Sequence, residues 1–368
     1  METDAADKTI IALSLFIVTG ITFFAIYNNW WNLGLFWDLG IYQRAAQDGL
    51  NGLDPYREVD GMAFVYHPLF LHLFSAIDSL ISLQGVLALG YILTLGWFIL
   101  EIQKFLKATL AAKYGTIPTF IMPVMVSMTP FAVGVTTMVT GNMTTYFHIA
   151  LFAFLLRTLR QKDRFTTVGT MVLIGIFTAV KPYFLAYILL ALLDKDSPRD
   201  KALRMTVATL VFVGIWASGL WIYPEEMQRF LHNIAGLQSS TRVDIGIGFY
   251  RIAYELGLSK LPALAVHLAV SAALLLWVWR GVKNMRKAPE TQGFALALSY
   301  FALTLVNPRI KEYDLWPALM FIFIFWNAYS PKAKQVFLIF SVLFSIPILI
   351  LIVTFLMGMP PGYDPIRG

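Results

Sequence analysis

Long apolar runs, separated by short polar stretches, dominate the chain and predict its secondary structure. A helix needs about 20 apolar residues to cross the roughly 30 Å hydrocarbon core of a bilayer. Runs that can span or enter a membrane cover residues 9–27, 84–103, 117–139, 143–157, 165–193, 205–223, 261–280, 291–306, 313–329 and 336–357. We therefore predict an all-α polytopic membrane protein that forms a single membrane domain over residues 1–368, with residues 9–27 retained as its first helix.

The run at 165–193 is too long for one ordinary span, and Pro182 interrupts it directly after Lys181. Proline removes a backbone donor and kinks or ends a helix. We predict two short helices that meet at Lys181-Pro182-Tyr183 and fold back as a hairpin. This brings the expected number of crossings to about eleven, within a range of 10–12.

The charged residues give an expected orientation. Segments 157–164 and 280–290 each carry four basic residues against one acidic residue, which is typical of cytoplasmic loops. Segment 28–65 instead carries five acidic residues against two basic ones. We expect a cytoplasmic N-terminus and three loops on the outer face, at 28–83, 224–260 and 307–314.

The first outer loop is too long for a simple connector. The stretch 66–80 is apolar but too short for a full span, so it indicates an interfacial or re-entrant helix. Turn-forming residues at 49–56 separate it from a second short helix at 38–48. Because long structured loops usually carry function, we expect the functional site to include this loop.

Composition excludes several classes of site. The chain is 58% hydrophobic and 14% charged, and it has no cysteine, so thiolate metal sites and cysteine nucleophiles are excluded. Topology accounts for the net charge of +6, and we expect no nucleic-acid partner. The sequence has no HExxH, Walker, GxGxxG or GxSxG motif. We therefore predict no metal and no nucleotide cofactor, and the oligomeric state is left open.

Asp38 is an unusual residue in the short helix expected at 38–48. At about 100° per residue, it falls opposite the polar stripe and shares the apolar face. The stripe consists of Gln43, Arg44, Gln47 and Asp48, and the apolar face of Ile41, Tyr42 and Ala45. Two compatible interpretations follow, that Asp38 is the N-cap of the helix or that it carries out chemistry.

Cations on the outer side form a second candidate feature. Lys181 lies inside an apolar run, where an ionisable residue indicates function unless its side chain snorkels to the interface. Arg309 and Lys311 lie in the third outer loop and Arg242 in the second. Such a group suits a phosphate, whereas each residue alone is also explained as an interfacial anchor or a local ion pair.

Three motifs in the first 200 residues resemble a known family. The stretches WDLGIYQRAAQDGLNGLDPY and FVYHPLF, then VTGNMTTYFHIALFAF, then GTMVLIGIFTAVKPYFLAYILLALL, occur in an order similar to that of GT-C superfamily glycosyltransferases that use polyprenyl-phosphate sugars. The motifs are similar to those of the phosphatidylinositol-mannoside mannosyltransferases. The resemblance implies a GT-C-like fold in a bacterial plasma membrane, with the active site on the outer face.

The resemblance also implies an activity. One sugar, a mannose-like hexose or a pentose, is expected to pass with inversion from a polyprenyl-phosphate donor to a lipid-linked or cell-envelope glycan acceptor. Asp38 matches the catalytic general base. Lys181, Arg309, Lys311 and Arg242 are the expected donor-phosphate residues, with no metal required. The expected sugar- or acceptor-binding residues are Tyr42, Tyr56, Tyr66, His67, Asn142 and Glu312.

Two other functions fit parts of the sequence. A secondary transporter could use Lys181 and the broken helix as its substrate site, although the chain shows no internal repeat. A non-catalytic assembly protein of a lipid-linked glycan pathway would use Asp38 only as a helix cap. The Gly141-Asn142 pair is itself also explained as a plain turn.

Overall fold

The computed structural model of the protein describes residues 37–57, 64–109, 140–161, 163–193, 197–239, 246, 248–285 and 289–325. Every regular element within these ranges is a helix, which confirms the predicted all-α fold. The helices are α2 (Trp37–Leu50), α3 (Pro68–Asp78), α4 (Leu83–Thr109), α7 (Met143–Gln161), α8 (Arg164–Val180), the 3₁₀-helix η3 (Pro182–Leu193), α9 (Pro198–Ile222), α10 (Pro224–Ser239), α11 (Phe249–Glu255), α12 (Lys260–Met285), α13 (Pro289–Thr304) and α14 (Glu312–Phe323).

Three of the described helices, α4, α9 and α12, are long and apolar enough to cross a membrane, which identifies a membrane protein. The predicted runs at 143–157, 291–306 and 313–329 correspond to the shorter helices α7, α13 and α14. Those at 9–27, 117–139 and 336–357 lie outside the described residues. The expected count of about eleven crossings therefore stays a prediction.

The predicted break after Lys181 is confirmed. Helix α8 ends at Val180, and Lys181 adopts an extended backbone with φ −134° and ψ 101°. This conformation is expected because the ring of a following proline disfavours the helical region. Beyond the break the chain continues as η3, which packs against both α8 and α9.

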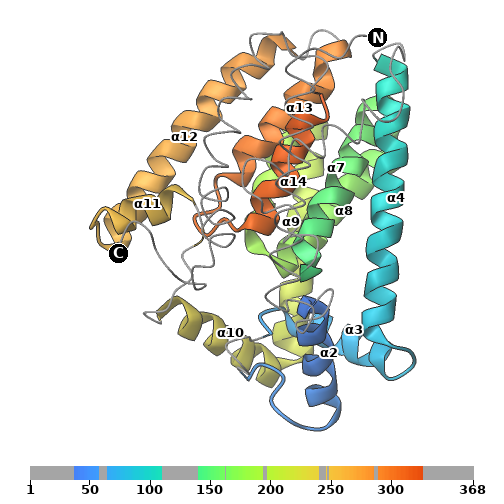
Figure 1. Ribbon diagram of the computed structural model, residues 1–368, viewed down its shortest axis with the longest axis vertical. Coiled ribbons are helices and arrows are strands. Elements are labelled where there is room, and N and C mark those ends of the chain that lie inside the picture. The colour runs from blue at the N-terminus through green and yellow to red at the C-terminus, as the bar shows by residue number, and fades with distance from the viewer. Residues whose placement is uncertain are drawn as a thin grey trace, which may run out of the picture.

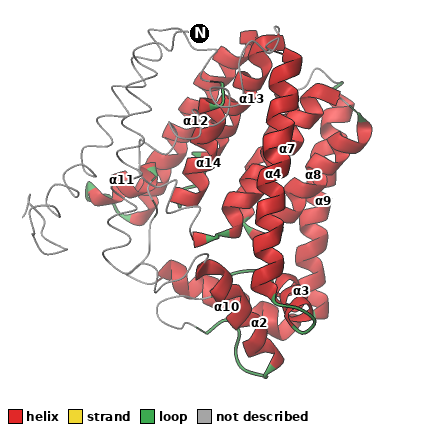
Figure 2. Cartoon of the chain, turned by 45° about the vertical axis from the view of Figure 1, so that its right-hand side comes forward, coloured by secondary structure: helices red, strands yellow, loops and turns green. Residues whose placement is uncertain are grey.

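The helices form two adjoining groups with a short cap at one end (Figure 1). Helices α4, α7, α8 and α9 lie side by side in both views, and α12, α13 and α14 stand beside them (Figures 1 and 2). Helices α2, α3 and α10 gather at one end of the long helices. Helix α3 confirms the short helix predicted within 66–80.

Two apolar clusters hold these parts together. The larger one joins α4, α7, α8, η3, α13 and α14, and at its centre the rings of Phe152 and Phe321 stack with centroids 3.8 Å apart. The smaller one joins α2 and α3 to the ends of α7, α8 and α10. At the end of the bundle away from α2, Arg160 of α7 donates to the buried Glu101 of α4 at 2.7 Å. That ion pair ties the two helices together.

Close contact between α8 and α9 depends on Gly175. A Cβ atom at this position would lie 2.6 Å from both the carbonyl oxygen of Ala208 and the Cβ of Val211. Small residues commonly permit such close backbone approach between membrane helices. We expect Gly175→Ala to separate the two helices and destabilise the protein by about 1–3 kcal/mol.

Thermal unfolding of the purified variant in detergent, followed by circular dichroism, measures this effect. Gly214→Ala on α9 is the matched control, because no atom of the described residues, apart from its own helix backbone and chain neighbours, lies within 4 Å of an added Cβ. It should be neutral or slightly stabilising, since alanine favours helix more than glycine does. Equal melting temperatures for Gly175→Ala and the wild type would contradict the proposed close packing.

Candidate active site

Four segments that are far apart in sequence meet at the end of the bundle where α2 lies. They are the start of α2 with Asp38, the turn before α7 with Asn142, the break after α8 with Lys181, and the loop 307–311 between α13 and α14. Lys181 interacts electrostatically with Asp38 and with the cations Arg309 and Lys311 of that loop. The structure thus brings together the predicted base and three of the four predicted cations.

Asp38 lies in the first turn of α2, which begins one residue earlier at Trp37. The N-cap interpretation requires Asp38 to lie directly before the helix, whereas the residue lies within its first turn. Its Oδ2 accepts a hydrogen bond of 2.8 Å from Nδ2 of Asn142. Burial raises the pKa of the Asp38 carboxyl above its ordinary value, and the bond from Asn142 and the charge of Lys181 partly oppose this increase.

Asn142 has two roles in this geometry. It lies directly before α7, and its Oδ1 accepts from the backbone N–H of Thr144 at 3.0 Å, as an N-cap residue does. Its Nδ2 at the same time donates to Asp38. Gly141 has a φ of 68°, which confirms that a tight turn precedes the helix. Asn142 therefore orients the carboxylate of Asp38.

The helix face predicted for Asp38 is confirmed in outline. Tyr42 and Ala45 are buried, as expected for the apolar face. Asp48 differs from the prediction of a solvated stripe, because it is buried and Arg57 donates to both of its carboxylate oxygens, at 2.9 and 3.0 Å. Arg57 lies across the turn, so this ion pair fastens the end of α2 to the loop that follows it.

Lys181 is held at the site by its neighbours. Its backbone N–H donates to the carbonyl of Phe177 at 2.8 Å, and its Nζ lies 5.0 Å from the ring centroid of Tyr66. A cation over an aromatic face is attracted by the electrons of the ring. The ammonium is thereby directed toward the side of the bundle where Asp38 lies.

The loop 307–311 is fixed by a side chain and by a close backbone contact. Oδ1 of Asn307 accepts from the backbone N–H of Arg309 at 3.0 Å. Gly246, with a φ of 76°, packs so closely that a Cβ atom there would lie 2.4 Å from the carbonyl oxygen of Ile310. Segment 224–260 therefore contacts the loop 307–311, and the side chain of Arg309 is exposed.

Most of the aromatic residues predicted to bind sugar form a supporting layer instead. Tyr42 and Tyr56 are 2% and 4% exposed, and their rings are covered by Phe64, Phe74 and Phe230. The hydroxyls of Tyr42 and Tyr66 lie 3.2 Å apart. The rings of Tyr42 and Tyr56 are therefore covered by their neighbours, and the sugar- or acceptor-binding role expected for these residues stays a prediction.

His67 also has a structural position. It is fully buried, and its Nδ1 accepts from the backbone N–H of Leu69 at 3.2 Å, which caps α3. Its ring packs so tightly on α9 that a Cβ at Gly219 would lie 2.3 Å from Nε2. Burial lowers the pKa of His67 to about 4, so the ring is neutral at physiological pH.

Some of the predicted residues cannot be placed. Arg242 lies outside the described residues. Glu312 is the residue at which α14 begins, and its side chain is not described. Arg251, another basic residue of the second outer loop, donates to Glu255 at 2.7 Å and to the carbonyl of Gly246 at 3.2 Å. For Arg251 the local ion pair is therefore the explanation.

A buried polar network behind the cations was not anticipated from the sequence. Its centre is Asp314, which is 1% exposed and accepts from the hydroxyl of Tyr183. His148 lies beside it, with Nε2 at 3.5 Å, and Nδ1 of the same ring lies 2.7 Å from the hydroxyl of Tyr300. The available signal was the presence of polar residues inside the apolar runs 143–157 and 291–306.

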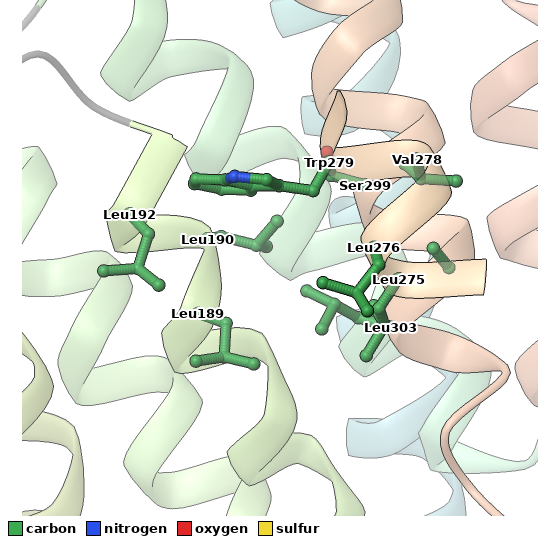
Figure 3. Close-up of a pocket in the computed structure, with 10 residues that line it drawn as sticks. Leu189, Leu190, Leu192, Leu275, Leu276, Val278, Trp279, Ser299 and Leu303 are labelled. Carbon is green, nitrogen blue, oxygen red and sulfur yellow. The ribbon is translucent and has the colours of Figure 1, made fainter. Parts of the chain in front are cut away.

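An apolar groove of about 280 Å³ opens between η3, α12 and α13 (Figure 3). The indole of Trp279 extends from α12 toward Leu190 and Leu192 of η3 (Figure 3). The groove contains none of the predicted site residues. The residues that line it are Leu189, Leu190, Leu192, Leu275, Leu276, Val278, Trp279, Ser299, Ala302 and Leu303.

The chemistry available here combines the carboxylate of Asp38 with the cation Lys181, which in turn interacts with Arg309 and Lys311. Within the part of the chain that the structure describes, no group of three or more metal-ligating side chains can hold a metal ion. The residues present can accept a proton at Asp38 and can bind an anion at Lys181, Arg309 and Lys311.

Comparison with known proteins defines the class of the molecule. No curated protein and no solved structure matches the chain. Residues 64–308, more than half of the chain, match the model of glycosyltransferase family 87, which is of the GT-C type. The protein is an all-α membrane protein that belongs to glycosyltransferase family 87.

Proposed function

We propose that the protein transfers one sugar, a mannose-like hexose or a pentose, from a polyprenyl-phosphate donor to a lipid-linked or cell-envelope glycan, with inversion. The observation that carries this proposal is the position of Asp38, which is hydrogen-bonded to Asn142 and faces Lys181. Membership of a glycosyltransferase family favours an enzyme over a transporter or an assembly protein.

In the proposed reaction, Asp38 accepts the proton of the acceptor hydroxyl as that oxygen attacks the anomeric carbon of the donor. The new glycosidic bond forms on one face of the sugar while the bond to the phosphate oxygen breaks on the other. The polyprenyl phosphate leaves with the bonding electrons. Because attack and departure are on opposite faces, the anomeric configuration inverts.

The leaving phosphate requires positive charge more than it requires a metal. Lys181, Arg309 and Lys311 interact electrostatically at the site, which suits a phosphate monoester or diester. Arginine can bind two phosphate oxygens at once, and lysine acts as a compact point charge. Arg242, Tyr66 and Glu312 stay proposed ligands of the donor or acceptor.

The donor's polyprenyl chain fits the apolar groove between η3, α12 and α13. Helix η3 begins directly after Lys181 and leads to the groove at Leu189–Leu192. At about 2 Å per residue of 3₁₀-helix, these leucines lie roughly 15–20 Å along η3 from the lysine. A phosphate at Lys181 could therefore extend its chain along one helix into an apolar environment.

The proposed site faces the outer side of a bacterial plasma membrane, with the N-terminus in the cytoplasm. Support comes from the basic residues Lys104, Lys107, Arg157 and Arg160, which lie at the ends of α4 and α7 away from the site. Basic residues are enriched at cytoplasmic ends of membrane helices. A polyprenyl-phosphate donor lies in the membrane itself, so an active site on the outer face can use it without a nucleotide sugar.

Replacing Asp38 by asparagine tests the proposed base. Asn retains the shape of the side chain but cannot accept the proton, so we expect Asp38→Asn to lower kcat about 10²- to 10⁴-fold. The assay follows transfer of radiolabelled mannose from polyprenyl-phosphomannose to membrane lipid extract by purified protein in nanodiscs. Asp48→Asn is the matched control on the same helix, because its carboxylate pairs with Arg57 and should affect stability alone.

The pH dependence provides an independent check of the same residue. Only ionised Asp38 accepts a proton, and its pKa is raised by burial. Activity of the wild type should therefore fall with decreasing pH, at a higher pH than an ordinary aspartate allows. Full transfer activity in correctly folded Asp38→Asn would refute the assignment.

Replacing Lys181 by alanine tests the phosphate site. We expect Lys181→Ala to weaken donor binding about 10- to 100-fold, the range for loss of a hydrogen bond to a charged group. KM for the donor should rise while the yield of folded protein changes little. Lys260→Ala is the control, because Lys260 is an exposed cation at the start of α12. Unchanged donor KM with a collapsed folded yield would assign Lys181 a structural role.

Filling the apolar groove tests the proposed path of the polyprenyl chain. We expect Leu192→Trp to raise KM for a long-chain donor about tenfold, equivalent to roughly 55 Å² of lost apolar contact. A donor with a two-isoprene chain should be unaffected, because it ends before the groove. Leu210→Trp on α9, at a position that is 64% exposed, is the control. An equal effect on short and long donors would exclude the groove.

A further inference from the structure

Asp314 is a second carboxylate of the site, and the proposed transfer does not use it. It is buried in the first turn of α14. Its Oδ2 accepts from the backbone N–H of Lys311 at 3.0 Å and lies 3.5 Å from Nδ2 of Asn307. Its Oδ1 accepts from the hydroxyl of Tyr183. A buried carboxylate with several donors has one fixed orientation.

These contacts connect the two stretches of chain that carry the cations. Tyr183 is two residues after Lys181, and Lys311 is two residues after Arg309. Asp314 accepts a hydrogen bond from the side chain of Tyr183 in the Lys181 segment and one from the backbone N–H of Lys311 in the 307–311 loop. The distance between the Lys181 segment and the 307–311 loop is therefore set through one carboxylate.

Asp314 also affects the charge balance at the site. Arg309 and Lys311 both act against the positive charge of Lys181, whereas Asp314 is its largest favourable electrostatic partner. Without a bound anion, three cations in one place repel one another. The negative charge of Asp314 offsets part of that repulsion and so helps to keep the cations together before a phosphate binds.

Asp314 also contacts a buried cluster of hydrogen-bonded aromatic residues. The His148 ring lies beside it and also bonds Tyr300, and the rings of Tyr300 and Tyr187 stack with centroids 4.4 Å apart. The hydroxyl of Tyr187 bonds that of Thr304 at 2.7 Å. Through His148, the carboxylate is connected to packed residues of α7, α13 and η3, which limits its displacement.

We propose that Asp314 is a positioning residue that holds the Lys181 segment and the 307–311 loop at the spacing needed to bind the donor phosphate. The inference rests on the proposed function, because it requires a phosphate at Lys181. It assigns no contact between Asp314 and the sugar. The geometry makes Asp314 a determinant of phosphate affinity rather than of proton transfer.

Asp314→Asn is the test, with binding of undecaprenyl phosphate and of neutral undecaprenol to protein in nanodiscs as the readout. The variant keeps the size of the side chain and removes its charge. We expect Kd for undecaprenyl phosphate to rise about tenfold and Kd for undecaprenol to stay at the wild-type value. A merely structural residue would change both lipids alike, or neither.

Glu101→Gln is the matched control. Glu101 is equally buried and is bonded by Arg160, but it lies at the opposite end of the bundle. Its replacement should lower thermal stability and leave the preference for phosphate unchanged. Loss of that preference in Glu101→Gln would show that any buried carboxylate has this effect and would overturn the proposal.

Tyr183→Phe keeps the test decisive if Asp314→Asn does not fold. It removes the hydroxyl that donates to Asp314, so it should weaken undecaprenyl phosphate binding several-fold and not weaken binding of undecaprenol. Wild-type phosphate affinity in Tyr183→Phe would overturn the positioning role proposed for Asp314.

The wild type separates failure of this inference from failure of the proposed function. If the wild type prefers undecaprenyl phosphate to undecaprenol and folded Asp314→Asn has the same preference, Asp314 has no positioning role and the donor proposal stands. If the wild type itself shows no preference, the phosphate donor is wrong and the role of Asp314 is overturned with it.

Discussion

The junction between Lys181 and Pro182 is the constraint on which the site depends. Proline lacks an amide hydrogen and disfavours helix at the residue before it, so α8 ends and η3 begins at this point. In a continuous helix, Lys181 and Tyr183 would lie about 200° apart on opposite faces. The break instead lets the ammonium lie over Tyr66 and lets the Tyr183 hydroxyl reach Asp314. The short segment Lys181-Pro182-Tyr183 thus connects the proposed phosphate site to Asp314.

Two of the buried carboxylates, Glu101 and Asp314, show how similar chemistry can have different uses. Glu101 is matched by a direct ion pair with Arg160 at 2.7 Å, which neutralises its charge locally. Asp314 is held mainly by neutral donors and by the His148 ring, and its charge acts on Lys181. A buried charge is costly unless it is compensated. The charge of Asp314 is balanced by Lys181 at the proposed site and not by a directly paired cation, and this is a reason to assign Asp314 a functional role.

Sequence reasoning predicted helices at the described apolar runs, the break at Pro182, the short helix within 66–80 and the apolar face of Asp38, because each depends on local periodicity or on proline geometry. It did not predict α10 and α11, which lie in the segment 224–260 that was expected to be a loop. It placed Asp38, Lys181, Arg309 and Lys311 on one side through charge and helix direction. It did not predict the partnership of Asp38 with Asn142, 104 residues away, or the centre at Asp314. Such contacts depend on how helices pack, and packing has no local pattern. The same limit explains why the sequence did not predict that Phe64, Phe74 and Phe230 cover Tyr42 and Tyr56.

The burial of those tyrosines strengthens the case for Asp38 as a base. Ser75 donates to the carbonyl of Ala46, Gln43 and Gln47 donate to Asp78, and the Tyr42 hydroxyl accepts from the backbone N–H of Met143 at 3.4 Å. Helix α2 is therefore bonded to α3 and to the start of α7, the same place from which Asn142 reaches Asp38. A general base loses rate steeply when it is displaced by about 1 Å. The aromatic layer therefore supports the helix that carries the proposed base.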